Sequence, residues 1–163
     1  MKAQSGFTMV ELMIVIAITG IVLALGALNY RPIRMKHTTE SYIRQIHATL
    51  MQARAAAANT NTPRIVTVAA NSVSVTQDLD GNGAINGAEG ATTVTTNFPR
   101  LVIGSSLGVP QTLTFDRRGL TTNAQTITLT GYGAGVSPAM DCVVVAFSRI
   151  NMGRTIGGAC VQQ

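Results

Sequence analysis

The sequence predicts an α+β protein in which one long N-terminal helix packs on an antiparallel, β-rich, sandwich-like C-terminal head. Three features lead to this expectation: an apolar run over residues 7–28, an amphipathic continuation over residues 29–60, and a series of short strand-like runs after it. About 130 of the 163 residues lie beyond the apolar run, which suits one domain with its own core.

The apolar run from Phe7 to Leu28 has the length of a membrane-spanning helix. At about 1.5 Å per residue it makes roughly 33 Å of helix, and the hydrocarbon core of a bilayer is about 30 Å thick. An ordinary secretory signal is cleaved after its apolar core, whereas the cleavage point indicated here lies before the run, so the run is retained. The sequence therefore predicts a permanent anchor.

Glu11 is the one charged residue in this run. A carboxylate at the centre of a membrane helix costs about 2.5–3.5 kcal/mol, and less near the helix end. A charge kept at that cost indicates a partner; the alternative is a plain anchor whose glutamate complements the positive end of the helix dipole. Gly20, Ala24 and Ala27 would let neighbouring helices approach closely, although small residues are also ordinary in membrane helices.

Positive charge gathers just after the apolar run, at Arg31, Arg34 and Lys36. This cluster conflicts with the positive-inside rule if the leader, with its single Lys2, stays in the cytoplasm. From residue 37 onwards eight arginines face six acidic residues, a net charge of +2. That balance is mild for a nucleic-acid-binding protein.

The helix is expected to bend at Pro32, because proline removes a backbone donor and clashes with the preceding turn. It then resumes as an amphipathic helix, with Arg44 and Gln52 facing away from the core, and ends in the poor helix formers of Asn59–Pro63. The residues expected to face the core are Ile43, Ile46, Leu50, Ala53 and Ala57.

Short runs rich in Val, Ile and Thr follow, separated by Gly, Asn and Pro, as is typical of antiparallel strands. The last run is apolar almost throughout, which predicts a central strand covered on both faces. The predicted strands are Arg64–Val68, Ser72–Thr76, Thr92–Thr96, Thr112–Asp116, Thr126–Thr130 and Cys142–Ile150.

Two cysteines, Cys142 and Cys160, are expected to form a disulfide. Two thiols do not make a zinc site, and neither His37 nor His47 lies near them in sequence. The bond would attach the C-terminal tail to the strand that begins near Cys142 and stabilise the fold by ~3 kcal/mol. The alternative is a pair of reduced, buried cysteines.

Residues 78–89 match the pattern of a calcium-binding loop. Oxygen ligands at the first, third and fifth places, a glycine at the sixth, a carbonyl at the seventh and a glutamate at the twelfth suit calcium. The flanking runs are predicted strands rather than helices, and Asp, Asn and Gly also form solvent-exposed turns without an ion. The predicted calcium ligands are Asp78, Asp80, Asn82, the Ala84 carbonyl and Glu89.

No catalytic pattern is expected to be functional, so the sequence predicts a protein that is not an enzyme. Gly104–Gly108 fits the G-x-S-x-G pattern of serine hydrolases, but that mechanism needs a later histidine and none follows His47. We interpret the segment as a turn.

The N-terminus resembles a type IV prepilin: a short polar leader ending in Gly6, then Phe7-Thr8-Met9-Val10-Glu11 opening the apolar run. The resemblance implies that prepilin peptidase cleaves after Gly6 and that the new N-terminal residue, Phe7, is N-methylated. It further implies that Glu11 pairs with the N-terminal amine of a neighbouring subunit during assembly.

This resemblance implies a pilin fold with four segments: a leader (1–6), a transmembrane and filament-core helix (7–28), its amphipathic continuation (29–60) and a globular head (61–163). The expected location is the inner membrane, crossed once, with the head in the periplasm before assembly into a pilus or pseudopilus. The expected partners are other pilin or pseudopilin subunits in a helical filament, the prepilin peptidase and the inner-membrane assembly platform.

The head resembles the GspH/FimT family of minor pilins and pseudopilins. The resemblance rests on Phe115-Asp116-Arg117-Arg118-Gly119, a following Thr-Ile-Thr-Leu strand, the Val-rich strand near the end, and Gly153-Arg154 before Cys160. It implies a minor pilin that acts in filament assembly or initiation at or near the tip of a type IV pilus. The alternative is a pseudopilin of type II secretion.

The same resemblance raises a DNA-binding alternative, because some FimT members capture DNA through a Gly-Arg-x-Arg motif. This chain has Ile156 in place of the second arginine, and phosphate binding depends on the number of cations engaged. A lone arginine beside a glycine is otherwise the solvated edge of a hairpin. The candidate DNA-binding residues are Gly153, Arg154, Arg149, Arg117 and Arg118.

Overall fold

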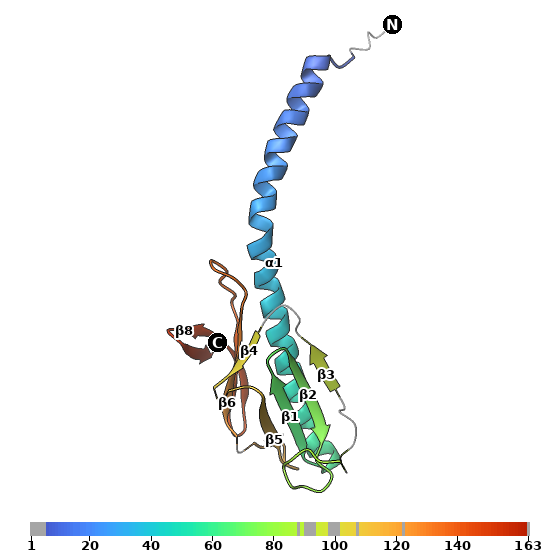
Figure 1. Ribbon diagram of the computed structural model, residues 1–163, viewed down its shortest axis with the longest axis vertical. Helices are drawn as coiled ribbons and strands as arrows, with labels where there is room; N and C mark the ends of the chain where they lie inside the picture. Colours follow the sequence, from blue (N-terminus) through green and yellow to red (C-terminus); the bar gives the residue numbers. More distant parts are fainter. Residues whose placement is uncertain are drawn as a thin grey trace.

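The computed structural model of the protein describes residues 6–87, 89, 94–97, 102–106, 108–121 and 123–162. One long helix, α1 (Met9–Thr60), precedes the strands of the head. Figure 1 shows that the head covers only the C-terminal half of α1, whereas the N-terminal half projects away from it. The α+β fold predicted from the sequence is confirmed.

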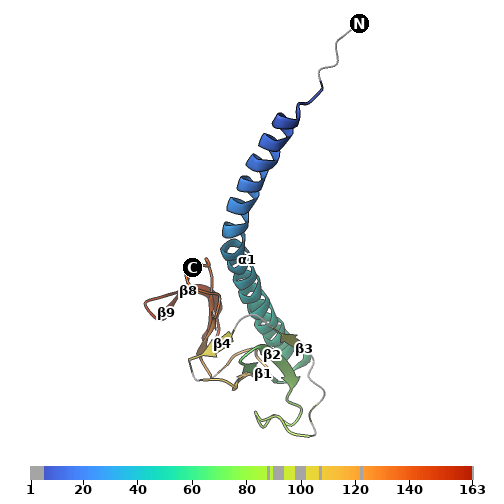
Figure 2. The same cartoon turned by 45° about the horizontal axis from the view of Figure 1, so that its top comes forward.

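Helix α1 begins and ends with capping residues. Thr8 is the N-cap, and its hydroxyl accepts a hydrogen bond from the Glu11 backbone N–H at 3.2 Å. At the other end the helix stops within the predicted 59–63 segment, and its C-cap residue, Asn61, adopts a left-handed conformation with φ of 51°. The helix passes through Pro32 without interruption, and its axis is gently curved (Figures 1 and 2).

The strands form two antiparallel sheets (Figure 1). The first has the order β3-β2-β1-β5, and the second has the order β4-β6-β7-β8-β9, with β7 at its centre. The strand bounds are β1 (Arg64–Ala69), β2 (Ser72–Gln77), β3 (Val94–Asn97), β4 (Val102–Ser105), β5 (Gln111–Phe115), β6 (Gln125–Thr130), β7 (Cys142–Val145), β8 (Ile150–Ile156) and β9 (Ala159–Gln162).

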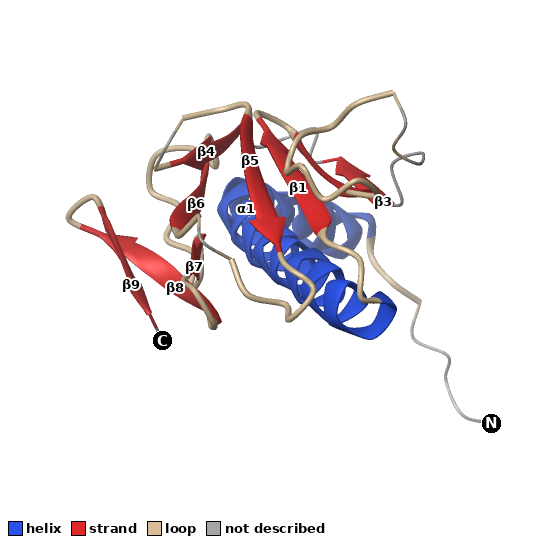
Figure 3. Cartoon of the chain, turned by 90° about the horizontal axis from the view of Figure 1, so that it is seen from below, coloured by secondary structure: helices blue, strands red, loops and turns tan. Residues whose placement is uncertain are grey.

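Both sheets pack against α1, and Figure 3 shows them arranged along one side of the helix. The predicted stripe from Ile43 to Ala57 is buried, while Arg44 and Gln52 are exposed as expected. The stripe joins inward-facing residues of both sheets in one cluster, so the helix forms part of the core of the head. The sheet residues in this cluster include Val66, Val75, Leu113, Phe115, Ile127, Leu129, Val143 and Val145.

Polar side chains of α1 hold the turns of the second sheet. Glu40 Oε1 accepts a hydrogen bond from the Ala139 backbone N–H at 2.9 Å, in the segment between β6 and β7. His47 Nε2 lies 3.2 Å from the Ile150 carbonyl, and Arg54 donates to the Ser148 carbonyl at 2.7 Å. These contacts fix the sheet at several points along the helix.

The predicted strand over Cys142–Ile150 is wrong in its extent. The chain turns after β7, and the Ala146 N–H donates to the Arg149 carbonyl at 2.8 Å before β8 begins at Ile150. Phe147, counted as part of the apolar strand, is 58% exposed in this turn. The turn contains neither glycine nor proline, so the apolar composition concealed it.

Three further strands escaped prediction, β4, β8 and β9, because glycine interrupts or borders each of them. The other predicted strands occur with ends shifted by one or two residues where the structure describes them. Thr92 and Thr93, at the start of the third predicted strand, lie outside the described residues.

Candidate functional site

The free half of α1 is the largest unburied apolar surface among the described residues. Every described residue from Gly6 to Gly26 is exposed, including the large apolar side chains from Phe7 to Leu25. The helix is long and apolar enough to cross a membrane once, judged by length and composition. A surface of this kind needs a cover, which is either lipid or other helices.

Glu11 is exposed in the first turn of α1. Its spacing from Thr8 is that of a capping box, and its position near the helix N-terminus lets the carboxylate complement the helix dipole. Among the described residues, no cation forms an ion pair with it. The carboxylate is thus held at the end of the helix and remains open to a partner outside the chain.

Gly20 and Ala24 lie on the exposed part of the same helix, and an added Cβ at Gly20 would meet no atom within 4 Å. The side chains of Ala27 and Leu28, and residues 1–5 of the predicted leader, are outside what the structure describes.

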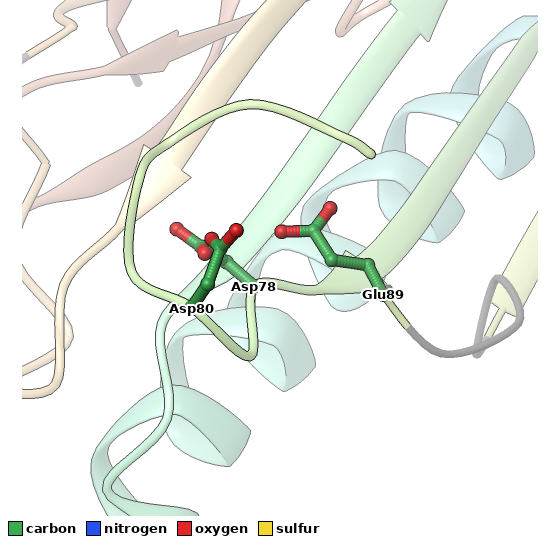
Figure 4. Close-up of side chains that lie close together, drawn as sticks. All are labelled: Asp78, Asp80 and Glu89. Atoms are coloured by element: carbon green, nitrogen blue, oxygen red, sulfur yellow. The ribbon is translucent and has the colours of Figure 1, made fainter. Parts of the chain in front are cut away.

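The predicted calcium loop follows β2 and brings three carboxylates together. Oxygen atoms of Asp78, Asp80 and Glu89 lie within 4.8 Å of one another, and Figure 4 shows these side chains gathered inside the loop. The Asp78 side chain is 1% exposed, and its two oxygens accept from the backbone N–H groups of Gly81 and Gly83 at 2.6 and 2.9 Å. Asp78 therefore organises the loop from within.

The two remaining predicted ligands lie in the same loop. Asn82 donates from its side chain to Asp80 at 2.7 Å, and its own Oδ1 accepts from the Ala84 backbone N–H at 2.7 Å. Asn86, which sequence reasoning did not include, donates to Asp80 at 2.6 Å. Gly81 and Gly83 have positive φ angles of 73° and 75°, which the tight turn requires.

Electrostatic repulsion in this cluster is visible at Glu89. Burial raises the pKa of the Glu89 carboxyl, and the neighbouring charges of Asp80 and Asp78 raise it further. Glu89 Oε2 accepts from the Asn86 backbone N–H at 3.0 Å, but Oε1 is buried and has no hydrogen-bond partner within the described residues. The donor set and the buried, unpartnered oxygen fit a hard divalent cation such as calcium.

The predicted disulfide between Cys142 and Cys160 is present, with 6.1 Å between the Cα atoms. It joins β7 to β9 and crosses the intervening strand β8. At the crossing lies Gly153, where an added Cβ would stand 2.9 Å from Cys160 Sγ and would collide with the Val161 carbonyl oxygen. The glycine of the Gly-Arg pair is thus required by the packing of the disulfide.

Arg154 donates a hydrogen bond to the hydroxyl of Ser137, in the segment between β6 and β7. Arg117 and Arg118 lie in the turn after β5, and Arg149 lies in the turn between β7 and β8; all three are exposed. A hydrogen bond from the Thr121 N–H to the Phe147 carbonyl brings these two turns together. The backbone segments that carry Arg117, Arg118 and Arg149 are therefore neighbours, and Arg154 lies farther along β8.

Sequence reasoning missed a buried carboxylate beside Arg154. Asp141 accepts from the Thr155 backbone N–H at 2.6 Å and from the Tyr132 hydroxyl at 3.0 Å. Burial and this bond to Asp141 raise the pKa of Tyr132. The signal in the sequence was the position of Asp141 directly before the apolar strand β7, because a carboxylate that is buried there needs hydrogen-bond donors.

The G-x-S-x-G segment is partly strand and partly turn. Gly104 and Ser105 end β4, and Ser105 donates to the Gln125 side chain at 2.8 Å. Ser106 accepts from the Thr126 backbone N–H at 3.1 Å, and Leu107 is outside the described residues. Both serines act in the contact between β4 and β6.

Comparison with known families gives two matches. Residues 1–27 match the prokaryotic N-terminal methylation motif, and residues 43–148 match the family of the type II transport protein GspH. No curated protein matches the sequence.

Two solved structures share the fold, both of the type IV minor pilin FimU from Pseudomonas aeruginosa strain PAO1. The first is 18% identical, with a TM-score of 0.55, and the match covers 69% of this chain and 86% of that one. The second, in another crystal form, is 17% identical, with a TM-score of 0.54, and the match covers 69% of this chain and 90% of that one.

Proposed function

Because the chain belongs to the family of the type II transport protein GspH and carries the N-terminal methylation motif, we propose that it is a minor pilin that acts in assembly or initiation at or near the tip of a type IV pilus. Family and fold already make it a pilin-like protein of the minor pilin and pseudopilin class. The likeness to FimU, described as a type IV minor pilin, supports the choice of a pilus.

The observation that carries this proposal is the division of α1 into a bare half and a covered half. The covered half supplies the core of the head, so the fold of the head does not need the bare half. A membrane would cover the bare half before assembly, with the head in the periplasm, and the helices of neighbouring subunits would cover it in a filament. Cleavage after Gly6 would leave Phe7 as the methylated N-terminus, four residues before Glu11.

The first test is mass spectrometry of sheared, purified filaments from the native host, with a search for the N-methylated Phe7 peptide. Finding that peptide in surface filaments supports the proposal. Finding the methylated chain only in the cell envelope favours the alternative, a type II secretion pseudopilin, with which the family match is equally compatible. An uncleaved leader contradicts both.

A second test separates assembly from anchoring at Glu11. We expect Glu11→Gln to remain in the membrane and to be cleaved, but to be lost from filaments, since the uncharged side chain no longer attracts the N-terminal amine of another subunit. Thr19→Ala, a second change on the exposed helix, is the matched control because the Thr19 hydroxyl bonds only to the Val15 carbonyl of its own helix turn within the described residues. Normal incorporation of Glu11→Gln would show that the glutamate only caps the helix.

DNA capture is the other candidate function, supported by the hydrogen bond that brings the chain after the Arg117–Arg118 turn to the turn that carries Arg149. If the head binds DNA through these arginines, it should shift duplex DNA in a salt-dependent way. Changing all three arginines to glutamine should abolish the shift. Arg154→Ala tests the motif itself, and its bond to Ser137 must break for it to reach a phosphate. Absence of any shift at low salt would remove this function.

We also propose that the 78–89 loop binds calcium through Asp78, Asp80, Asn82, the Ala84 carbonyl and Glu89. A cation there would offset the burial, and the repulsion from Asp80 and Asp78, that raise the pKa of Glu89, and it would occupy the unpartnered oxygen of that carboxylate. At a calcium concentration 100 times the Kd, the protein should gain about 2.7 kcal/mol of stability.

Thermal unfolding with added calcium or with a chelator measures this effect. Glu89→Gln should abolish the gain, because the amide supplies a weaker ligand, and magnesium should replace calcium poorly because it demands a smaller octahedral site. An unchanged melting temperature in calcium and in chelator would show that the loop is an ion-free turn.

A further inference from the structure

The boundary between the bare helix and the head carries a group of exposed cations that form no ion pair with the residues that the structure describes. Arg31, Arg34 and Lys36 are all exposed, and no acidic residue lies between Glu11 and Glu40 in the sequence. Glu40 is itself engaged by Arg44, at 3.6 Å, and by the Ala139 N–H. Within the described residues, none of the three boundary cations takes part in an ion pair.

The position of these cations matches the headgroup layer of a membrane. Arg31 follows the end of the apolar run at Leu28 by three residues, and the segment from Arg31 to Lys36 rises about 8 Å along the helix. The polar layer on each side of a bilayer is roughly 5–8 Å thick. If the apolar run fills the hydrocarbon core, Arg31, Arg34 and Lys36 lie about 5, 9 and 12 Å beyond its edge along the helix. Arg31 then lies within the polar layer, and the long side chains of Arg34 and Lys36, which tilt towards the helix N-terminus, extend back towards it.

The same segment has a surface that suits a lipid molecule. Tyr30 and Ile33 are 61% and 55% exposed, and with Arg34 they line a shallow hollow of about 500 Å³ along one helix face. Ile33 and Arg34 are three and four positions after Tyr30, so both of their side chains are neighbours of the Tyr30 ring. An aromatic ring and an aliphatic side chain beside a guanidinium offer contacts to the glycerol region and to a phosphate together.

The positive charge of Arg31, Arg34 and Lys36 supports a role for these residues on the exported side of the membrane. The positive-inside rule favours cations on the cytoplasmic side, so three cations beyond the apolar run work against the orientation with an exported head. Their presence is explained if anionic headgroups of the outer leaflet bind them. This explanation rests on the proposed function, in which the chain is anchored in the membrane before it is assembled into a filament.

We propose that Tyr30, Arg31, Arg34 and Lys36 form a cationic collar that binds anionic phospholipids of the outer leaflet of the inner membrane before assembly. The collar holds the head at a defined height above the bilayer, because moving the cations inward would strip them of both water and phosphate. Extraction of the subunit into a filament must then break these lipid contacts.

The natural absence of tryptophan allows a direct test with the whole chain in lipid vesicles. Tyr30→Trp places a single indole in the collar, and vesicles contain phosphatidylglycerol and phosphatidylcholine with bromine atoms on one lipid or the other. Bromine quenches indole fluorescence at short range, so the ratio of the two quenching efficiencies reports which lipid lies beside residue 30. Equal lipid composition in both leaflets makes the result independent of orientation.

We expect the brominated anionic lipid to quench about twofold more strongly than the brominated neutral lipid, because cations near a membrane surface attract anionic headgroups. The preference should fall in high salt, and it should disappear when Arg31, Arg34 and Lys36 are all changed to glutamine. Arg34→Gln should weaken it, whereas the matched control Arg44→Gln, on the same helix but beside Glu40, should leave it intact.

Equal quenching by the two lipids in the Tyr30→Trp protein would overturn the collar but would agree with a chain that is anchored in the membrane. Absence of quenching by either lipid would overturn both, since residue 30 would then lie away from any bilayer. A preference that persists in the triple glutamine variant would also overturn the assignment of these cations.

Discussion

At the scale of single residues, Gly153 shows how a motif can have a structural cause. The resemblance to the GspH/FimT family made its Gly-Arg pair a candidate for DNA capture, but the disulfide and the β9 backbone occupy the space where a side chain would begin. Spacing along the chain could not reveal this, because Cys160 and Val161 come close to Gly153 only when β9 pairs with β8.

We expect Gly153→Ala to lower the free energy of unfolding by about 1–3 kcal/mol, the usual cost of overpacking a tight site. Denaturant unfolding of the full chain in detergent, followed by circular dichroism, measures the change. Gly87→Ala is the control, since an added Cβ there meets no atom within 4 Å and Gly87 does not have a positive φ. Equal stability of the two variants would show that β9 yields to the added methyl group.

Glu40 is a second residue whose role was hidden in the sequence, because a glutamate on a helix facing solvent and one holding a distant loop have the same spacing. Its two interactions differ in strength: the Ala139 N–H lies in a part-buried contact, whereas Arg44 is a largely exposed partner. A buried acceptor is costly to remove, but an exposed ion pair contributes little.

Glu40→Ala should therefore lower the free energy of unfolding by about 1.5–3 kcal/mol, and Arg44→Ala by less than about 1 kcal/mol. The comparison of the two variants by denaturant unfolding separates the loop contact from the ion pair. If both variants lose the same amount, the ion pair and not the bond to Ala139 accounts for the effect.

At the scale of elements, the disulfide determines how the end of the second sheet is held. Strand β9 is an edge strand whose residues are mostly exposed, so its packing contributes little. The bond to the buried Cys142 compensates by attaching β9 to the central strand β7. The pairing was predictable from the two cysteines, but the β8–β9 hairpin that it clamps was not.

Reduction of this disulfide should lower stability by ~3 kcal/mol, as the chain-entropy model gives for a loop of this length. Unfolding of the mature chain with and without a thiol reductant measures the loss, and the Cys142→Ser/Cys160→Ser variant checks that no other effect of the reductant contributes. Unchanged stability on reduction would mean that strand pairing alone holds β9.

Prediction of the helix and the strands succeeded where the spacing of the apolar residues matches the backbone structure that forms. The stripe from Ile43 to Ala57 and the alternating strands β1 and β2 have periods that each suit only one type of structure. It failed at the turn after β7, where an apolar run continues through Phe147 although the backbone reverses. An internal hydrogen bond closes that turn, and Ser148 is the one turn-favouring residue in it.

At the scale of the whole molecule, the two halves of α1 have different surroundings, because the first half is exposed and the second half packs in the core of the head. Its apolar first half and its buried second half could both be predicted from their different patterns of hydrophobic residues. The sequence did not reveal that the helix would lie in the core of both sheets, since that depends on contacts between distant strands. This division predicts that the stability of the head is independent of the bare half of α1.

A pair of truncations tests this independence. Residues up to 34 are exposed where their side chains are described, and Met35 is the first helix residue to pack against the core. A protein of residues 35–163 should thus unfold cooperatively, at a midpoint close to that of the full chain in detergent. Circular dichroism during heating gives both midpoints.

A protein of residues 48–163 is the matched control, because it also lacks Ile43, Ile46 and Glu40. Each buried isoleucine contributes about 2–5 kcal/mol, so their loss removes much of a total stability of about 5–15 kcal/mol, and this shorter protein should not fold. Failure of the 35–163 protein to fold would show that the bare half of α1 supports the head. Cooperative unfolding of the 48–163 protein would show instead that the two sheets form a core without the helix.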